Sequence, residues 1–369
     1  MPITFFTHEP KIDFIRWRYV SYAISIGLLL VGLGSALFGN GLKMGIDFAG
    51  GVIMQVQFQK PVADETLKNS LEGPALPGIS IQSFGEGGQE YLLRLSSMDT
   101  TDALSLRKSV TTALSAAFPD NPAEIVRMEM VGPKVGDDLT NKALSALYYA
   151  VLLIAVYISG RFEQRWMAGA IMAAALWGGM YALGFAGFGM GWLVLLALGI
   201  TVVVCFFLRL NFALGAVVGL LHDVFITVGL LSVLDVEIDL NVVAALLTLV
   251  GYSLNDTIIV YDRLRENLRA APRMELGALI NKSINQTLSR TVLTSGTTLV
   301  ATLALYLLGG GVIHDFALTV LIGVFVGTAS SIYVSSAILL ALGDTETYVR
   351  MQEKEEYESP VSMVLFRRK

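Results

Sequence analysis

The chain has little charge and almost no cysteine. Only 15% of its 369 residues are charged, whereas 54% are hydrophobic, and Cys205 is the single cysteine. One cysteine inside an apolar run excludes a disulfide framework and a thiolate metal site. The sequence also lacks a GxxxxGK[ST] phosphate loop, so it gives no sign of ATP hydrolysis. A mean hydropathy of +0.63 lies outside the range of soluble globular proteins and indicates an integral membrane protein.

Long apolar runs supply the candidate membrane spans. A helix needs roughly 20 apolar residues to cross the hydrocarbon core, and about eight runs have this length. They lie at approximately 17–38, 139–160, 166–186, 190–208, 212–234, 240–261, 290–310 and 315–342. Basic residues precede the first run as they would in a signal peptide, but the length of the run favours a retained anchor.

Lysine and arginine are unevenly distributed between the loops. They precede the first run, follow the second, fourth and sixth runs, and recur in the C-terminal tail, whereas the loop DVEID at 235–239 is acidic. The positive-inside rule therefore predicts that both termini lie in the cytoplasm. Residues 39–136 are then the one substantial periplasmic segment.

Residues 39–136 have the pattern of a small folded domain. GVIMQVQF, ISIQSF, YLLRLSS and AEIVRMEMV have the pattern of strands, while ADETLKNSLE and TDALSLRKSVTTALSAAF have that of helices, the second starting at Thr101 and Asp102. The order β-α-β-β-α-β predicts a ferredoxin-like α+β domain. It contains no His or Cys, which favours binding or the transmission of movement over catalysis.

The predicted domain opens with GLKMGIDFAGG. Its Gly45, Gly50 and Gly51 permit positive φ or close approach of the backbone. Asp47 fits a turn or a helix cap, and the sequence alone assigns it no chemical role.

Polar residues interrupt three of the later apolar runs. An ionisable side chain in hydrocarbon costs at least a few kcal/mol, so it normally faces the bundle interior or a water-filled cavity and has a partner. His222 and Asp223 lie in the middle of the fifth run, and Asp256 lies in the sixth. The sixth and seventh runs supply further polar candidates: Thr248, Tyr252, Asn255, Thr287, Arg290, Thr291, Thr294 and Thr298.

Two interpretations of Asp256 and Arg290 stay open. In the first they form a static buried ion pair, which adds little net stability because desolvation offsets the attraction. In the second Arg290 moves relative to Asp256, and the carboxylate takes up and releases an ion during a cycle. The second is favoured, and it leaves open whether the ion is H⁺ or Na⁺. No cofactor, metal ion or nucleic-acid partner is expected.

Several long motifs together resemble the SecF family. They are GYSLNDTIIVYDRLREN, FALGAVVGLLHDV, SRTVLTSGTTL, VGPKVG and GIDFAGG, and the resemblance covers about residues 14–343. SecF is the smaller partner of SecD in the bacterial SecDF protein-export complex, within the resistance-nodulation-division (RND) superfamily. The resemblance implies a polytopic α-helical membrane protein with an RND/SecF-like bundle and one ferredoxin-like periplasmic domain.

The resemblance also implies a function, which is not that of an enzyme. With SecD, such a protein uses the proton-motive force to assist late stages of protein export through the SecYEG channel of the bacterial inner membrane. Preproteins are contacted mainly through SecD, and YajC is a further partner. Asp256 of the NDT motif and Arg290 of the SRT motif are implied to take part in ion conduction. His222 and Asp223 belong to another membrane motif and are further ion-coupling candidates, which either conduct or only support the site. We expect movement to reach the periplasmic domain through the second span and VGPKVGDD.

Two features depart from the family pattern. Ala49 stands where GIDFTGG has Thr, and about eight spans are predicted where SecF has six. The extra segment, 164–210, contains a stretch that aligns with the start of the following run and pairs Gly169 with Gly215, which favours duplication over chance similarity. We expect it to be a peripheral hairpin that faces lipid or a partner. The predicted organisation is a first span within 1–38, a domain at 39–136, a second span at 137–163, the hairpin at 164–210, four core spans at 211–343 and a cytoplasmic tail at 344–369.

Two other classes of function were weighed. A stand-alone RND exporter of small molecules or lipids fits the membrane carboxylates, but the single domain of about 100 residues is small for one. An intramembrane aspartyl protease is suggested by Tyr261 and Asp262, but the sequence has no GxGD motif.

Overall fold

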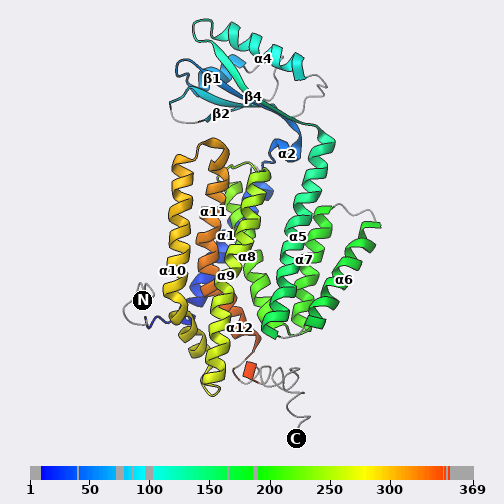
Figure 1. Cartoon of the computed structure of the whole chain (residues 1–369), viewed down its shortest axis with the longest axis vertical. Coiled ribbons are helices and arrows are strands. Elements are labelled where there is room, and N and C mark those ends of the chain that lie inside the picture. Colours follow the sequence, from blue (N-terminus) through cyan, green and yellow to red (C-terminus); the bar gives the residue numbers. More distant parts are fainter. Residues whose placement is uncertain are drawn as a thin grey trace, which may run out of the picture.

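A bundle of long helices supports a small α/β domain at one end (Figure 1). The computed structural model describes residues 10–39, 41–71, 79–84, 87–95, 103–163, 166–185, 190–343, 345 and 348–349. The predicted helix start at Thr101 and Asp102 and nearly all of the predicted tail 344–369 lie outside these residues.

The bundle contains most of the described chain. Its elements are a short 3₁₀ turn, Ile15–Trp17, followed by α1 (Arg18–Phe38), α5 (Pro133–Glu163), α6 (Trp166–Phe185), α7 (Met190–Phe207), α8 (Asn211–Val233), α9 (Leu240–Ala270), α10 (Leu276–Leu308), α11 (Gly311–Ser330), a π-helical segment (Ser331–Ser335) and α12 (Ser336–Leu342).

Six segments of the described chain are long and apolar enough to cross a membrane. They are Ile15–Phe38, Pro133–Phe162, Asn211–Val233, Leu240–Ala270, Leu276–Leu308 and Ile313–Leu342. The expected count of eight is not confirmed, because α6 and α7 carry shorter apolar stretches, Gly169–Gly178 and Gly191–Phe207. These two helices lie at the edge of the bundle beside α5 (Figure 1), and Trp177 and Trp192 on them are exposed.

Helices α9 and α10 are longer than their apolar runs. Apolar composition marks only the part of a helix that suits hydrocarbon, whereas these helices continue into polar sequence. There the Asn267 side-chain amide of α9 donates to Ser283 Oγ (2.9 Å) and Gln286 Oε1 (3.0 Å) of α10. The hydrogen bonds hold the two helices together at the end of the bundle opposite the α/β domain.

The α/β domain has the order of elements that the sequence pattern predicted. Its elements are β1 (Gly51–Phe58), α3 (Asp64–Leu71), β2 (Ile79–Phe84), β3 (Glu90–Leu95), α4 (Ala103–Ala117) and β4 (Ala123–Val131). They form one sheet in the order β2-β3-β1-β4, with every neighbouring pair antiparallel. Alternate residues of β1 and β3 are buried, since successive strand residues point to opposite faces.

A short connection joins the bundle to the domain. After α1 the chain forms α2 (Ile46–Ala49) and enters β1 through Gly50 and Gly51, whose φ values are +72° and +137°. A Cβ on Gly51 would lie 2.6 Å from the carbonyl oxygen of Leu95, so both the backbone angle and the space require glycine here. At the other side of the domain, α5 begins two residues after β4 and runs down the whole bundle (Figure 1).

Two glycines let α1 approach α8 closely. A Cβ built on Gly32 would lie 2.6 Å from Cα of Gly229, and one on Gly229 would lie 2.8 Å from Cα of Gly32. Small residues at such crossings allow backbones to pack without a hydrophobic driving force, which is absent between helices in lipid.

Gly32→Val should therefore destabilise the protein by about 1–3 kcal/mol, because the added side chain forces the two backbones apart. Thermal unfolding in detergent measures the change. Gly34→Val is the matched control, since a Cβ on Gly34 meets no atom within 4 Å. Equal shifts for the two variants would contradict the importance of the glycine contact.

Candidate functional site

The bundle buries two carboxylates. Asp223 on α8 is 0% exposed and Asp256 on α9 is 1% exposed, and no other Asp or Glu is buried among the residues whose burial is described. The sequence singled out both residues. Their surroundings differ, and the difference defines two parts of one candidate site.

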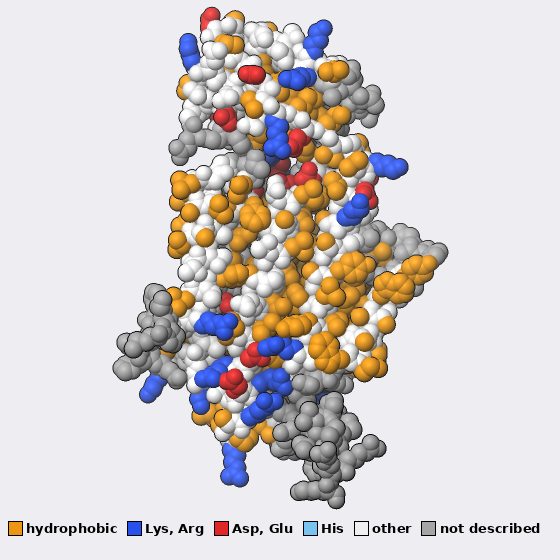
Figure 2. Space-filling view, in the orientation of Figure 1, with side chains coloured by type: hydrophobic (Ala, Val, Ile, Leu, Met, Phe, Trp, Pro, Cys, Tyr) orange, Lys and Arg blue, Asp and Glu red, His pale blue; other side chains and the backbone are white. Residues whose placement is uncertain are grey.

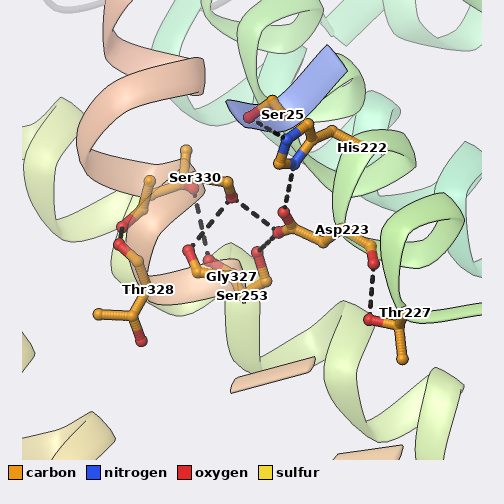
Figure 3. A network of polar contacts seen from close by, with 10 residues as sticks. Ser25, His222, Asp223, Thr227, Ser253, Gly327, Thr328 and Ser330 are labelled. Atoms are coloured by element: carbon orange, nitrogen blue, oxygen red, sulfur yellow. Dashed lines mark hydrogen bonds and ion pairs between the residues drawn. The ribbon is translucent and has the colours of Figure 1, made fainter. Parts of the chain in front are cut away.

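Asp223 is fully satisfied by side chains from its own and neighbouring helices (Figure 3). Its Oδ2 accepts hydrogen bonds from Ser253 Oγ of α9 (2.5 Å) and Ser330 Oγ of α11 (2.8 Å). Its Oδ1 lies 2.9 Å from Nδ1 of His222, whose Nε2 lies 2.9 Å from Ser25 Oγ of α1. The group thus ties together α1, α8, α9 and α11, as a buried charge requires.

Asp256 is only half satisfied. Its Oδ2 accepts a hydrogen bond from Ser295 Oγ of α10 (3.1 Å), and Ser295 Oγ in turn accepts one from Thr328 Oγ1 of α11 (2.8 Å). Its Oδ1 is buried and has no hydrogen-bond partner among the described residues. The buried hydroxyls of Tyr252 and Thr291 are likewise without a partner there. The carboxylate therefore keeps an acceptor that the described chain does not use.

Arg290 does not form a direct ion pair with Asp256. The sequence analysis treated it as the partner of the carboxylate, but no pair within 4.0 Å joins them in the described chain, and Ser295 makes the contact instead. Arg290 is exposed, and five residues along a helix correspond to a rotation of about 140° from its face. It is still near enough to act on Asp256 electrostatically.

Most of the predicted threonines bond to their own helix. Thr248 is exposed and donates to the carbonyl oxygen of Ala244 (2.8 Å), and Thr287 and Thr294 donate to carbonyl oxygens three and four residues earlier on α10. Asn255 is exposed. These side chains do not join the two carboxylates.

Four serines and one threonine bond to the two carboxylates or to their hydrogen-bond partners, and none of them is among the predicted site residues. Ser25, Ser253, Ser295, Thr328 and Ser330 supply the contacts. The available signal was weak, because hydroxyl groups commonly bond to a carbonyl four residues back and are tolerated throughout apolar helices. Ser253, one helical turn before Asp256, and Ser295, which follows Thr294, lie beside residues that the sequence singled out.

Both carboxylates depend on the same two helices. Helix α9 contributes Ser253 to one site and Asp256 to the other, while α11 contributes Ser330 to the first and reaches the second through Thr328. The π-helical segment Ser331–Ser335 follows at once, and such segments often mark functional positions in helices. A displacement of α11 therefore changes the surroundings of both carboxylates together.

The GIDFAGG residues lie elsewhere, at the junction between bundle and domain. The Gly45 backbone N–H donates to the carbonyl oxygen of Ile238 (2.8 Å), and Asp47 Oδ2 accepts from the N–H of Leu240 (3.0 Å). Gly50 and Gly51 turn the chain into β1. In the described chain no group of three or more His, Cys, Asp or Glu side chains is arranged to hold a metal ion.

Comparisons with known proteins agree with this architecture. The profile of the family described as "Protein export membrane protein SecD/SecF, C-terminal" matches residues 109–188 and 188–345, and that of the "SecD/SecF GG Motif" matches residues 35–62. The boundary at 188 falls between α6 and α7. The fold and the matches together define a multi-pass membrane protein of the SecD/SecF type.

Individual relatives narrow the family. The chain is 36% identical to the protein translocase subunit SecF of Vibrio alginolyticus over 94% of this chain and 95% of that protein. It is 40% identical to SecF of Magnetococcus marinus over 91% of this chain and 94% of the relative. The chain belongs to the SecF family of protein translocase subunits, which are components of protein transport.

Solved structures show the same fold within a longer protein. The crystal structure of SecDF, a translocon-associated membrane protein from Thermus thermophilus, matches with a TM-score of 0.65 and 32% identity. The match covers 91% of this chain and 39% of the SecDF chain. A second structure, SecDF in a super-membrane-facing form, matches with a TM-score of 0.55 and covers 96% of this chain and 41% of the other.

Asp223→Ala should destabilise the protein by about 2 kcal/mol, because it removes the acceptor shared by two serines and His222. Thermal unfolding in detergent again supplies the measurement. Asp262→Ala is the matched control: Asp262 pairs with Arg161 at 2.7 Å on the exposed end of α9, and such pairs contribute less than about 1 kcal/mol. A loss at Asp223 no greater than that at Asp262 would show that the network does not hold the helices together.

Proposed function

We propose that this chain works with SecD to couple the proton-motive force to late stages of protein export through the SecYEG channel of the bacterial inner membrane. The observation that carries the proposal is the half-satisfied carboxylate of Asp256. An ionisable residue inside the membrane marks an ion pathway by default, since hydrocarbon excludes charge. Because Oδ1 has no hydrogen-bond partner in the part of the chain that the structure describes, Asp256 has a position that can accept a proton.

Asp223 serves a different purpose in this proposal. Both of its oxygens are engaged, and it holds four helices in place, so we assign Asp223 and His222 to the support of the site rather than to conduction. The carried ion is H⁺, and Na⁺ is the alternative because carboxylate and hydroxyl oxygens also suit a hard cation. No cofactor takes part.

The exposed polar residues favour SecD as the neighbour of α9 and α10. Arg290, Asn255 and Thr248 lie on membrane-spanning helices and would face lipid if the chain were alone, at a cost that a second protein removes. The longer SecDF chain, of which this chain covers 39%, contains enough additional sequence to supply that surface. Preproteins are bound mainly through SecD, and YajC is a further partner.

The proposed orientation places both termini in the cytoplasm. Lys and Arg side chains gather on the visible face at the end of the bundle that lies opposite the α/β domain (Figure 2), as the positive-inside rule expects of a cytoplasmic end. The α/β domain is then periplasmic. Its strand order β2-β3-β1-β4 supports a ferredoxin-like domain, in which β3 separates the two strands joined by α3.

Protonation of Asp256 starts the conformational change. A neutral carboxyl group accepts a weaker hydrogen bond from Ser295 than a carboxylate does, so the hold of α10 and, through Thr328, of α11 on α9 is loosened. Loss of the negative charge also removes the long-range attraction between Asp256 and Arg290. Helices α10 and α11 then shift relative to α9, and loss of the proton restores the first arrangement.

Asp256→Asn should lower proton-motive-force-dependent export of a secreted reporter by about tenfold or more, since the amide cannot carry the proton. Export is measured in cells whose only copy of the gene is the variant. Asp262→Asn, six residues along the same helix, is the control and should export normally. Normal export by Asp256→Asn, in cells that hold the variant at the usual level, would refute the coupling role.

A further inference from the structure

The loop between α8 and α9 is hydrogen-bonded and ion-paired to the segment that leads into the α/β domain. Met44 and Ile238 form a parallel β-bridge, in which the N–H of Gly45 donates to Ile238 and the N–H of Ile238 donates to Lys43, both at 2.8 Å. Lys43 forms an ion pair with Asp235. A further ion pair joins Arg94 of β3 to Glu237. Backbone and side chains thus connect the loop to both α2 and the sheet.

Two carboxylates from different segments cap the start of α9. The first amide groups of a helix have no acceptor within the helix. Asp239, the N-cap residue, accepts from the N–H of Val242 (2.8 Å), and Asp47 of α2 accepts from the N–H of Leu240 (3.0 Å). Burial raises the pKa of Asp239 above its ordinary value, and repulsion from Asp47 and Asp315 adds to this effect. The helix terminus, which carries partial positive charge, opposes that repulsion.

Apolar side chains also fill the contact between the α8–α9 loop and α2, which is called the joint below. Phe48 of α2 and Ile238 of the loop are 9% and 8% exposed, and both belong to a buried cluster that includes Val242 and Leu246 of α9. A Cβ on Gly136, near the start of α5, would lie 2.6 Å from the carbonyl oxygen of Phe48. The joint is therefore close-packed, and such interiors transmit displacement rather than absorb it.

Helix α9 runs without interruption from this joint to Asp256. The distance from Leu240 is 16 residues, or about 24 Å along the axis at 1.5 Å per residue. The segment contains no proline that would kink it. A displacement of α9 at Asp256 therefore reaches the joint directly.

We propose that Asp47 is a positioning residue that fixes α9 to the base of the α/β domain, so that α9 and α2 move as one body. The proposal rests on the proposed function and adds a route to it. The sequence predicts that movement passes through α5 and VGPKVGDD. In the structure α9 offers a second route, and both helices contact α2. Asp47 acts through the helix that carries Asp256 and does not itself touch the ion.

Two substitutions of Asp47 distinguish the role of its hydrogen-bond acceptor from that of its negative charge. Asp47→Ala removes the acceptor for Leu240 and should lower proton-motive-force-dependent export by about fivefold, the effect expected from loss of a helix cap. Asp47→Asn keeps a side-chain oxygen in the same place and should retain at least half of the export. Asp120→Ala, an exposed carboxylate in the turn before β4, is the control.

The readouts distinguish positioning from mere stability. Export stimulated by the proton-motive force is compared with the amount of the chain in the membrane and with its copurification with SecD, both of which should be unchanged in Asp47→Ala. Normal export by Asp47→Ala, or a loss matched by a loss of the protein, would overturn the proposal. Asp256→Asn is tested in the same assay. If Asp256→Asn loses export and Asp47→Ala does not, only the proposal for Asp47 is refuted. If Asp256→Asn exports normally, the proposed function is refuted.

A disulfide tests whether the joint stays closed. Met44 and Ile238 lie opposite each other at the spacing of neighbouring strands, about 4.8 Å, which a disulfide can span. Met44→Cys and Ile238→Cys are combined with Cys205→Ser and assayed in inverted membrane vesicles, oxidised and reduced. Because α9 and α2 move together, the oxidised protein should export as well as the reduced one. Loss of export on oxidation, absent from the two single-cysteine variants, would show that the joint must open.

Discussion

The burial of two carboxylates among apolar helices is the constraint on which the arrangement of the bundle depends. Hydrocarbon cannot solvate a charge, so helices that carry Asp223 and Asp256 must gather polar groups from their neighbours. The chain does this with hydroxyl groups, which serve as donors without adding charge. Helices α9 and α11 contribute to both sites, and this shared use explains why they pack against α8 and α10 in one continuous group.

The two carboxylates differ in what they contribute: Asp223 stabilises the bundle, whereas Asp256 is placed to respond to a change in protonation. Asp223 has partners for both oxygens and joins four helices, as a structural element does. Among the described residues Asp256 has one hydrogen-bond partner and one unpartnered oxygen, so a change in its protonation alters a single hydrogen bond there, that with Ser295. A fully satisfied carboxylate at both positions would give a more stable bundle and remove the group that can respond to an ion gradient.

The sequence predicted the carboxylates and the element order of the α/β domain, because charge in an apolar run and the periodicity of strands are visible in one dimension. It predicted about eight spans, of which six are long and apolar enough in the described chain. It could not predict the partners. Ser253, Ser295 and Ser330 do not differ from other hydroxyl residues of the apolar helices until the helices are placed. The rotation of about 140° between Arg290 and Ser295 determines that Ser295, and not Arg290, contacts Asp256. For Asp47 the sequence suggested a turn or a helix cap but could not show which helix it caps, because the amide that donates to it lies nearly 200 residues away.

The two hydroxyls of α11 that reach the carboxylate sites, those of Thr328 and Ser330, each have a second acceptor on their own helix. Thr328 Oγ1 also donates to the carbonyl oxygen of Val324 (2.7 Å), and Ser330 Oγ to that of Gly327 (3.2 Å). When contact with the neighbouring helix is lost, these groups keep a partner and no buried donor is abandoned. The barrier to separating α11 from its neighbours is lowered, because these two donors remain paired throughout, and the bundle can exchange between arrangements repeatedly.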